Sequence, residues 1–131
     1  MKPFYIVEDD PLIRRYLLHL LTRVMKVQVI EWTEGQDVIA TVEAEQPPLV
    51  LLDITLRGAT LDGRPTDGLA LCRRIKEQLG DAAPPVMLLT AHAVEGDRER
   101  FLGESGADDY QAKPIFDEND FLDRMAKLVA G

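Results

Sequence analysis

The sequence predicts one α/β domain of three layers, in which helices cover both faces of a doubly wound, parallel, five-stranded sheet. Five short apolar segments alternate along the chain with five segments of helical periodicity, which is typical of a parallel sheet with right-handed crossovers. The 131 residues are the length of a single domain, expected over residues 1–131. A hydrophobic fraction of 46% is sufficient for a core and excludes intrinsic disorder.

The expected strands differ in how apolar they are. Residues 3–7, 49–52 and 85–89 contain unbroken apolar runs, which suit central strands that are buried on both faces. Residues 27–32 and 109–112 are more mixed in polarity. We therefore expect these two strands at the edges of the sheet.

Three of the five helical segments have a clear apolar face, whereas residues 36–45 and 94–103 have weaker patterns. The clear faces consist of Leu12, Ile13, Tyr16, Leu17, Leu20, Leu21 and Val24; of Leu71, Cys72, Ile75 and Leu79; and of Phe121, Met125, Leu128 and Val129.

Helix starts are also marked in the sequence. Asp10 followed by Pro11 is typical of an N-cap with proline at the first helical position. Thr33 and Gln36 have the spacing of a capping box and predict the start of the second helix. Asp117 is the expected cap of the last helix.

Composition excludes several classes of function. The chain has 15 Lys and Arg against 23 Asp and Glu, a net charge of −8 that argues against direct binding of nucleic acid. No apolar run approaches the length of a membrane span, and no secretory signal begins the chain, which suggests a cytoplasmic protein. The lone Cys72 excludes an internal disulfide and a multi-cysteine zinc site.

Carboxylates follow two of the expected central strands. Glu8 and Asp9 come after the first strand and Asp53 after the third, so all three belong to the sheet edge where such folds bind ligands. Partly buried carboxylates that lie together are costly unless a cation offsets their repulsion. We therefore expect Mg²⁺ at Glu8, Asp9 and Asp53, whereas Asp10 is explained as a helix cap.

A hydroxyl and an ammonium complete this edge. Thr90 ends the fourth strand and Lys113 follows the fifth. Each residue alone is typical of an ordinary turn or surface position. Together they can hold oxygens of a tetrahedral anion that also contacts magnesium, which is the arrangement used in phosphoryl transfer.

Four segments, read in order, resemble the receiver domains of two-component response regulators: IVEDDPLIR at residues 6–14, LLDITL at 51–56, LLTA at 88–91 and GADDYQAKP at 106–114. The resemblance covers essentially the whole chain. It implies the flavodoxin-like strand order 2-1-3-4-5 with five helices.

The resemblance also implies individual roles. Asp53 is the phosphoacceptor, Asp9 binds Mg²⁺ directly, Glu8 acts through water, and Thr55 offers its backbone carbonyl. The family's conserved hydroxyl, lysine and switch aromatic correspond to Thr90, Lys113 and Tyr110, and the Lys113–Pro114 peptide bond is expected to be cis.

The implied function is a phosphorylation-dependent signalling switch. A sensor histidine kinase or histidine phosphotransfer protein donates a phosphoryl group to Asp53, which forms an acyl phosphate. The new dianion draws Thr90 toward it and leaves space that Tyr110 fills. This movement changes the surface of the fourth helix, the last strand and the fifth helix, through which a homodimer can form. The same group of residues catalyses autodephosphorylation, so the chain is expected to be no ordinary enzyme.

The chain departs from the family pattern in several places. Glu8 replaces the commoner aspartate, Arg57 replaces the usual proline, and His92 lies near the expected site mouth. The segment after Asp53 is also longer than usual. We expect residues 56–66 to form a loop over part of the site mouth, with Arg57 and Arg64 near a bound phosphoryl group.

Two other functions remain open. A metal-dependent phosphatase similar to the haloacid dehalogenase family also uses an aspartate nucleophile, but Thr55 stands where that family has a second acid. A pseudo-receiver that only binds partners usually lacks an acidic or phosphoacceptor residue, whereas this chain has the complete set.

Overall fold

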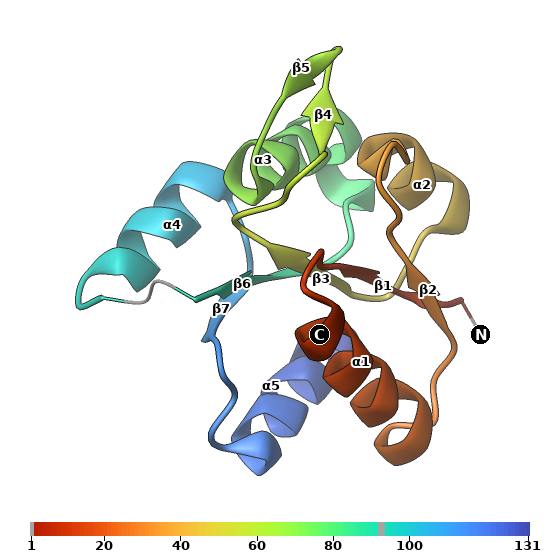
Figure 1. The fold of residues 1–131 in the computed structure, drawn as a ribbon, viewed down its shortest axis with the longest axis vertical. Helices are drawn as coiled ribbons and strands as arrows, with labels where there is room; N and C mark the ends of the chain where they lie inside the picture. Colours follow the sequence, from red (N-terminus) through yellow and green to blue (C-terminus); the bar gives the residue numbers. More distant parts are fainter. Residues whose placement is uncertain (1, 92–93) are drawn as a thin grey trace.

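The computed structural model describes residues 2–91 and 94–131, and its centre is a parallel sheet with helices on both faces (Figure 1). The sheet has the strand order β2-β1-β3-β6-β7, which is the expected order 2-1-3-4-5 when only its own five strands are counted. Its strands are β1 (Phe4–Val7), β2 (Val29–Glu31), β3 (Val50–Asp53), β6 (Val86–Thr90) and β7 (Asp109–Ala112).

Two layers of helices enclose this sheet. Helices α1 and α5 cover one face, and α2, α3 and α4 cover the other (Figure 1). The helices are α1 (Pro11–His19), continued by the π turn η1 (Leu20–Val24); α2 (Val38–Glu45); α3 (Gly68–Leu79), continued by the 3-10 turn η2 (Gly80–Ala82); α4 (Asp97–Ser105); and α5 (Glu118–Ala130). No helix within the described residues is long and apolar enough to cross a membrane.

The three central strands contribute to both core layers. Leu52 and Leu88 pack toward α2 and α3, whereas Leu51 and Met87 pack toward α1 and α5. All residues of β1, β3 and β6 are buried, because neighbouring side chains of a strand point to opposite faces and both faces are covered. The unbroken apolar runs therefore identified the central strands correctly, and the mixed segments form the edges β2 and β7.

Helix caps follow the sequence with one correction. Asp10 accepts hydrogen bonds from the backbone of the first turn of α1, and Asp117 caps α5, as expected. The capping box at Thr33 and Gln36 is wrong: these residues form a turn, and Asp37 caps α2 by accepting from the Ala40 N–H at 3.0 Å. The helix begins only at Val38, so Asp37 and not Thr33 is in the capping position.

Three residues of the predicted apolar helix faces are exposed: Leu12, Val24 and Val129, at 72%, 50% and 42%. Each lies in the first or last turn of its helical element.

The segment after Asp53 contains a small hairpin where the sequence predicted an irregular loop. Strands β4 (Thr60–Leu61) and β5 (Arg64–Pro65) are antiparallel and joined by the two residues Asp62 and Gly63. Both of these residues have positive φ, 55° and 79°, as tight hairpin turns require. The Asp-Gly pair was therefore a hairpin signal. Arg74 of α3 binds the Asp62 carboxylate at 2.6 Å, which ties the hairpin tip to the helix.

Gly68 positions α3 against the end of β3. Its N–H donates to the Ile54 carbonyl at 2.7 Å, and a Cβ atom at this position would lie 2.1 Å from the Asp53 carbonyl oxygen. The backbone of α3 at Gly68 therefore contacts the backbone of Asp53 directly, and only glycine allows this close approach. Asp67, which precedes this glycine, caps α3 by accepting a hydrogen bond from the Ala70 N–H at 2.9 Å.

We expect Gly68→Ala to lower the free energy of unfolding by roughly 2 kcal/mol or more, because the added methyl group overlaps a backbone that cannot move freely. Gly103→Ala in α4 is the matched control: no described atom lies within 4 Å of its Cβ position, so better helix propensity should raise stability by about 0.5–1 kcal/mol. Urea denaturation followed by circular dichroism measures both. Equal stability of the Gly68→Ala variant and the wild type would contradict this packing.

Candidate functional site

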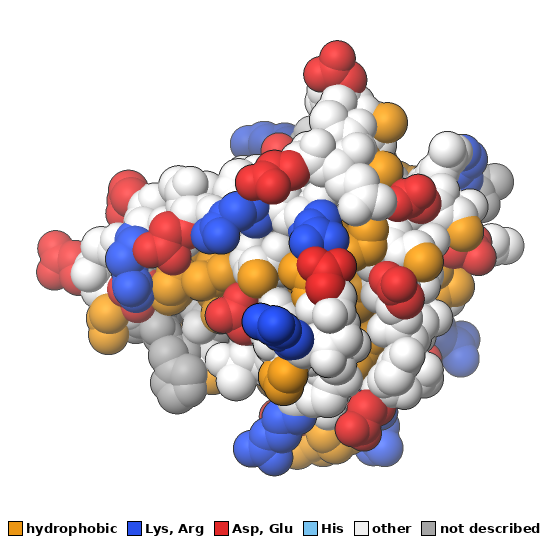
Figure 2. All heavy atoms as spheres, turned by 90° about the horizontal axis from the view of Figure 1, so that it is seen from above, with side chains coloured by type: hydrophobic (Ala, Val, Ile, Leu, Met, Phe, Trp, Pro, Cys, Tyr) orange, Lys and Arg blue, Asp and Glu red, His pale blue; other side chains and the backbone are white. Residues whose placement is uncertain are grey.

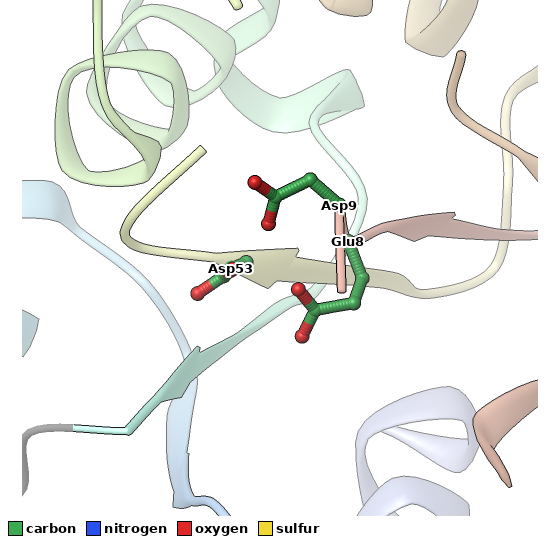
Figure 3. A group of neighbouring side chains, drawn as sticks. All are labelled: Glu8, Asp9 and Asp53. Carbon is green, nitrogen blue, oxygen red and sulfur yellow. The ribbon is translucent and has the colours of Figure 1, made fainter. Parts of the chain in front are cut away.

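The candidate site is an acidic cluster at the carboxyl edge of the sheet. Glu8 and Asp9 follow β1, Asp53 ends β3, and their side chains converge in Figure 3. One carboxylate oxygen from each residue lies within 4.8 Å of the other two. Glu8 is completely buried and Asp53 is 4% exposed, so little water separates these charges.

Lys113 provides the positive charge inside this cluster. Its Nζ atom lies 2.6 Å from Glu8 Oε1 and 3.4 Å from Asp53 Oδ1. The side chain is 9% exposed, so the ion pairs are largely shielded from solvent. The following peptide bond to Pro114 is cis, as the resemblance implied.

Backbone amides also bind oxygens of all three carboxylates. The N–H of Thr55 donates to Asp53 Oδ1, and the N–H of Arg57 donates to Asp9 Oδ2, each at 3.2 Å. The N–H of Asp10 donates to Glu8 Oε2, also at 3.2 Å. These contacts orient the acids. They could not be predicted from the sequence, because almost every residue type has a backbone N–H donor.

The crowding of charges changes the proton affinity of Asp53. Burial, together with a hydrogen bond and like charge from Glu8, raises the pKa of Asp53 to about 8, although Lys113 and the Thr55 N–H act in the opposite direction. Burial alone would lower the pKa of Lys113, but its contacts with Glu8 and Asp53 outweigh burial and raise it. The three carboxylates thus carry more negative charge than the Lys113 ammonium neutralises.

A divalent cation would supply the missing positive charge. Magnesium prefers a few carboxylate oxygens together with water, and the three converging carboxylates match that preference. Lys113 is a single charge and already contacts two of the three acids. The donor set is therefore suited to Mg²⁺ held by Glu8, Asp9 and Asp53.

A pocket of about 400 Å³ opens onto this cluster. It is lined by Asp9, Asp10, Pro11, Leu12, Asp53, Thr55, Arg57, Ala91 and Lys113. The pocket gives solvent and small molecules access to Asp53.

The beginning and the middle of the long segment after Asp53 lie at two different places on the molecule. Arg57 lines the pocket, but residues 60–63 line a separate groove of about 790 Å³ between the hairpin, α2 and α3. Arg64 lines neither. Residues 56–66 were expected to cover part of the site mouth, with Arg57 and Arg64 near a bound phosphoryl group. Arg57 does lie at the pocket, whereas Arg64 belongs to the hairpin and does not line it. His92 lies outside the described residues.

Thr90 and Tyr110 lie on the sheet face that is covered by α4. Leu88 pairs with Tyr110 across β6 and β7, and Thr90 is two residues further along the same face. Thr90 is 3% exposed, and its carbonyl accepts the Lys113 N–H at 2.7 Å. The structure therefore brings Thr90 to the end of the strand next to Asp53, although it does not line the pocket.

The Tyr110 side chain is turned inward. Its ring centroid lies 5.9 Å from that of Phe101, and its hydroxyl is buried with no hydrogen-bond partner among the described residues. Burial and the charge of nearby Asp97 raise the pKa of this hydroxyl. Within the described residues the ring is therefore held by packing, and its hydroxyl adds no hydrogen bond.

Known proteins with the same fold share this arrangement of elements. The N-terminal receiver domain of RstA from Klebsiella pneumoniae, in a BeF3-activated form, has a TM-score of 0.78 and 27% identity and covers 98% of this chain and 99% of that one. The receiver domain of the sensor histidine kinase PA1611 from Pseudomonas aeruginosa PAO1 has a TM-score of 0.76 and 25% identity, covering 99% and 98%. Its structure contains a magnesium ion coordinated in the active-site cleft.

Sequence comparison gives the same result. The transcriptional regulatory protein AfsQ1 of Streptomyces coelicolor is 36% identical over 118 residues, which are 88% of this chain and 46% of AfsQ1. The chain thus spans about half the length of the curated relatives that it matches. Residues 4–126 match the response regulator receiver domain. The chain therefore belongs to the receiver domain family of two-component response regulators, in which phosphorylation carries the signal.

Proposed function

We propose that Asp53 accepts a phosphoryl group in a Mg²⁺-dependent reaction, and that the donor is a histidine kinase or a histidine phosphotransfer protein. The observation that carries the proposal is the surroundings of Asp53: a buried carboxylate, an ammonium 3.4 Å away, and two further carboxylates suited to a divalent cation. The magnesium ion in the PA1611 receiver domain supports the choice of cation.

The chemistry follows from these groups. An Asp53 oxygen attacks phosphorus, a P–O bond forms, the P–N bond to the donor histidine breaks, and the nitrogen keeps the electron pair. Lys113 can bind an oxygen of the transferred group, and Thr90 can donate its hydroxyl to another. Bound Mg²⁺, held by Glu8, Asp9 and Asp53 with the Thr55 carbonyl as a further ligand, would neutralise charge on the phosphoryl oxygens. Water attacking the same phosphorus later restores the free carboxylate.

The surface around the pocket supports a protein donor. Leu12 lines the pocket and is 72% exposed, and Phe116, three residues after Lys113, is 91% exposed. Exposed apolar side chains beside a polar site are suited to transient contact with another protein. Figure 2 shows a face on which hydrophobic side chains are exposed between acidic and basic ones, a mixture that favours reversible binding.

The proposed output is a change in the surface of α4, β7 and α5. A phosphoryl dianion on Asp53 would attract Thr90, and Tyr110 would fill the space that Thr90 leaves. In the structure the ring already packs 5.9 Å from that of Phe101, so the inward position that this proposal requires is sterically accessible. Since β7 is an edge strand with open backbone groups, a partner or a second copy of the chain can bind along it.

Mg²⁺ should bind wild-type protein and bind Asp9→Asn at least about tenfold more weakly, since one of three carboxylates is lost. Affinity should also fall as pH decreases from 9 to 6, by at most about tenfold per pH unit, because Asp53 with its raised pKa must release a proton first. Titration calorimetry measures both effects. Asp62→Asn on the hairpin is the control and should bind normally. An unchanged affinity in Asp9→Asn would exclude this metal site.

Acetyl phosphate with Mg²⁺ should load one phosphoryl group onto each wild-type chain and none onto Asp53→Ala, and Lys113→Ala should load at least about tenfold more slowly because an oxygen contact is lost. Intact-protein mass spectrometry follows the adduct. A haloacid dehalogenase-like phosphatase would instead release many equivalents of phosphate per chain. Loading of the Asp53→Ala variant at the wild-type rate would refute the assignment of the phosphoacceptor.

Phosphorylation or beryllofluoride should shift amide NMR signals of residues 94–116 far more than those of residues 36–45, because the proposed route runs through Thr90 and Tyr110. Tyr110→Phe is a matched probe: it removes a hydroxyl that has no hydrogen-bond partner among residues 2–91 and 94–131, and it should stabilise the inward ring. Thr90→Ala should keep the phosphoryl adduct and lose the distant shifts. If Thr90→Ala responds as the wild type does, the signal takes another route.

A further inference from the structure

The backbone that follows Asp53 alternates between buried and exposed residues. Ile54 and Leu56 are 9% and 7% exposed and pack into the core, whereas Thr55 and Arg57 are exposed and line the pocket. Two apolar anchors therefore hold this segment against the sheet, and they leave the residues between and after them at the mouth of the site.

The position of Arg57 is further fixed by its neighbours. Its N–H binds Asp9 Oδ2, and Asp9 points toward this segment in Figure 3. The next residue, Gly58, has a φ of 79°, and a Cβ atom there would lie 2.6 Å from Glu34 Cγ. Arg57 is thus a constrained residue at the edge of the acidic cluster, although it begins a long inserted segment.

The Arg57 guanidinium has no assigned task within the fold. Across residues 2–91 and 94–131 it forms no ion pair and no side-chain hydrogen bond. Five of the other nine arginines are paired with carboxylates: Arg14, Arg74, Arg98, Arg100 and Arg124. An unpaired guanidinium beside a pocket rich in acids is available to an incoming anion.

Charge balance indicates what that anion is. Three carboxylates face the single ammonium of Lys113, so even with a divalent cation bound the fully ionised site retains no positive charge. A phosphoryl donor brings two further negative charges. We infer that the guanidinium of Arg57 binds the phosphoryl oxygens of the incoming donor at the pocket mouth, as a second cation beside Lys113. Its planar fork of N–H groups suits a phosphate. This inference rests on the proposed function and extends it.

The test compares Arg57→Ala, Arg57→Lys and Arg64→Ala in phosphorylation by acetyl phosphate with Mg²⁺. Arg64 is an exposed arginine of the same segment, so its removal changes the net charge equally without changing the pocket lining. Arg57→Ala should raise the half-saturating concentration of acetyl phosphate by about three- to tenfold. Arg57→Lys should fall between this variant and the wild type, and Arg64→Ala should match the wild type. The difference between Arg57→Ala and wild type should shrink in added salt.

Two results would contradict this inference and leave the proposed function intact. Wild-type kinetics in Arg57→Ala would mean that the guanidinium does not contact the donor. An equal loss in Arg57→Ala and Arg64→Ala would mean that only net charge matters. If the wild type itself accepts no phosphoryl group, the proposed function fails first and this inference fails with it.

Discussion

Three carboxylates meet at the carboxyl edge of this sheet around one ammonium, and the properties of the site follow from that imbalance. The central strands bring the acids together because each strand ends at the same edge. Lys113 and the backbone N–H groups of residues 10, 55 and 57 compensate for part of the repulsion. The repulsion that is not compensated, together with burial, raises the pKa of Asp53 to about 8. The Asp53 carboxylate therefore binds a proton readily when no other cation is bound. The core therefore holds together a group of charges that would separate in solution.

Much of this arrangement could be predicted from sequence, because its determinants are local. The unbroken apolar runs before Glu8 and Asp53 identified two central strands, and the residues after a parallel strand necessarily lie at the binding edge. The same argument predicted that Lys113, which follows the last strand of the sheet, lies at this edge. Asp10 and Asp117 were recognisable as caps because the capping interaction spans only a few residues.

The features that escaped prediction depend on contacts between distant segments. The residue that caps α2 depends on where the helix begins: Asp37 directly precedes Val38, and the spacing of Thr33 and Gln36 alone does not show this. The need for Gly68 arises from the carbonyl of Asp53, and the inward ring of Tyr110 arises from Phe101 on α4. The hairpin was different: Asp62 and Gly63 carried a clear local signal, but the flanking strands have only two residues each and no alternating apolar pattern.

Because of the hairpin, the length of the segment after Asp53 can change without a change in the geometry of the site. Its base is closed by a hydrogen bond from the Thr66 N–H to the Ala59 carbonyl at 3.2 Å, so the chain leaves and returns at nearly the same point. Lengthening such a closed excursion costs little free energy, about 0.6 kcal/mol for each doubling of a flexible loop. Evolution can therefore change the tip around Asp62 without moving Arg57 or Gly68. Related sequences should vary in length within residues 60–65 and keep constant spacing on either side, which makes this position a place where new binding specificity can be acquired without change to the acidic cluster.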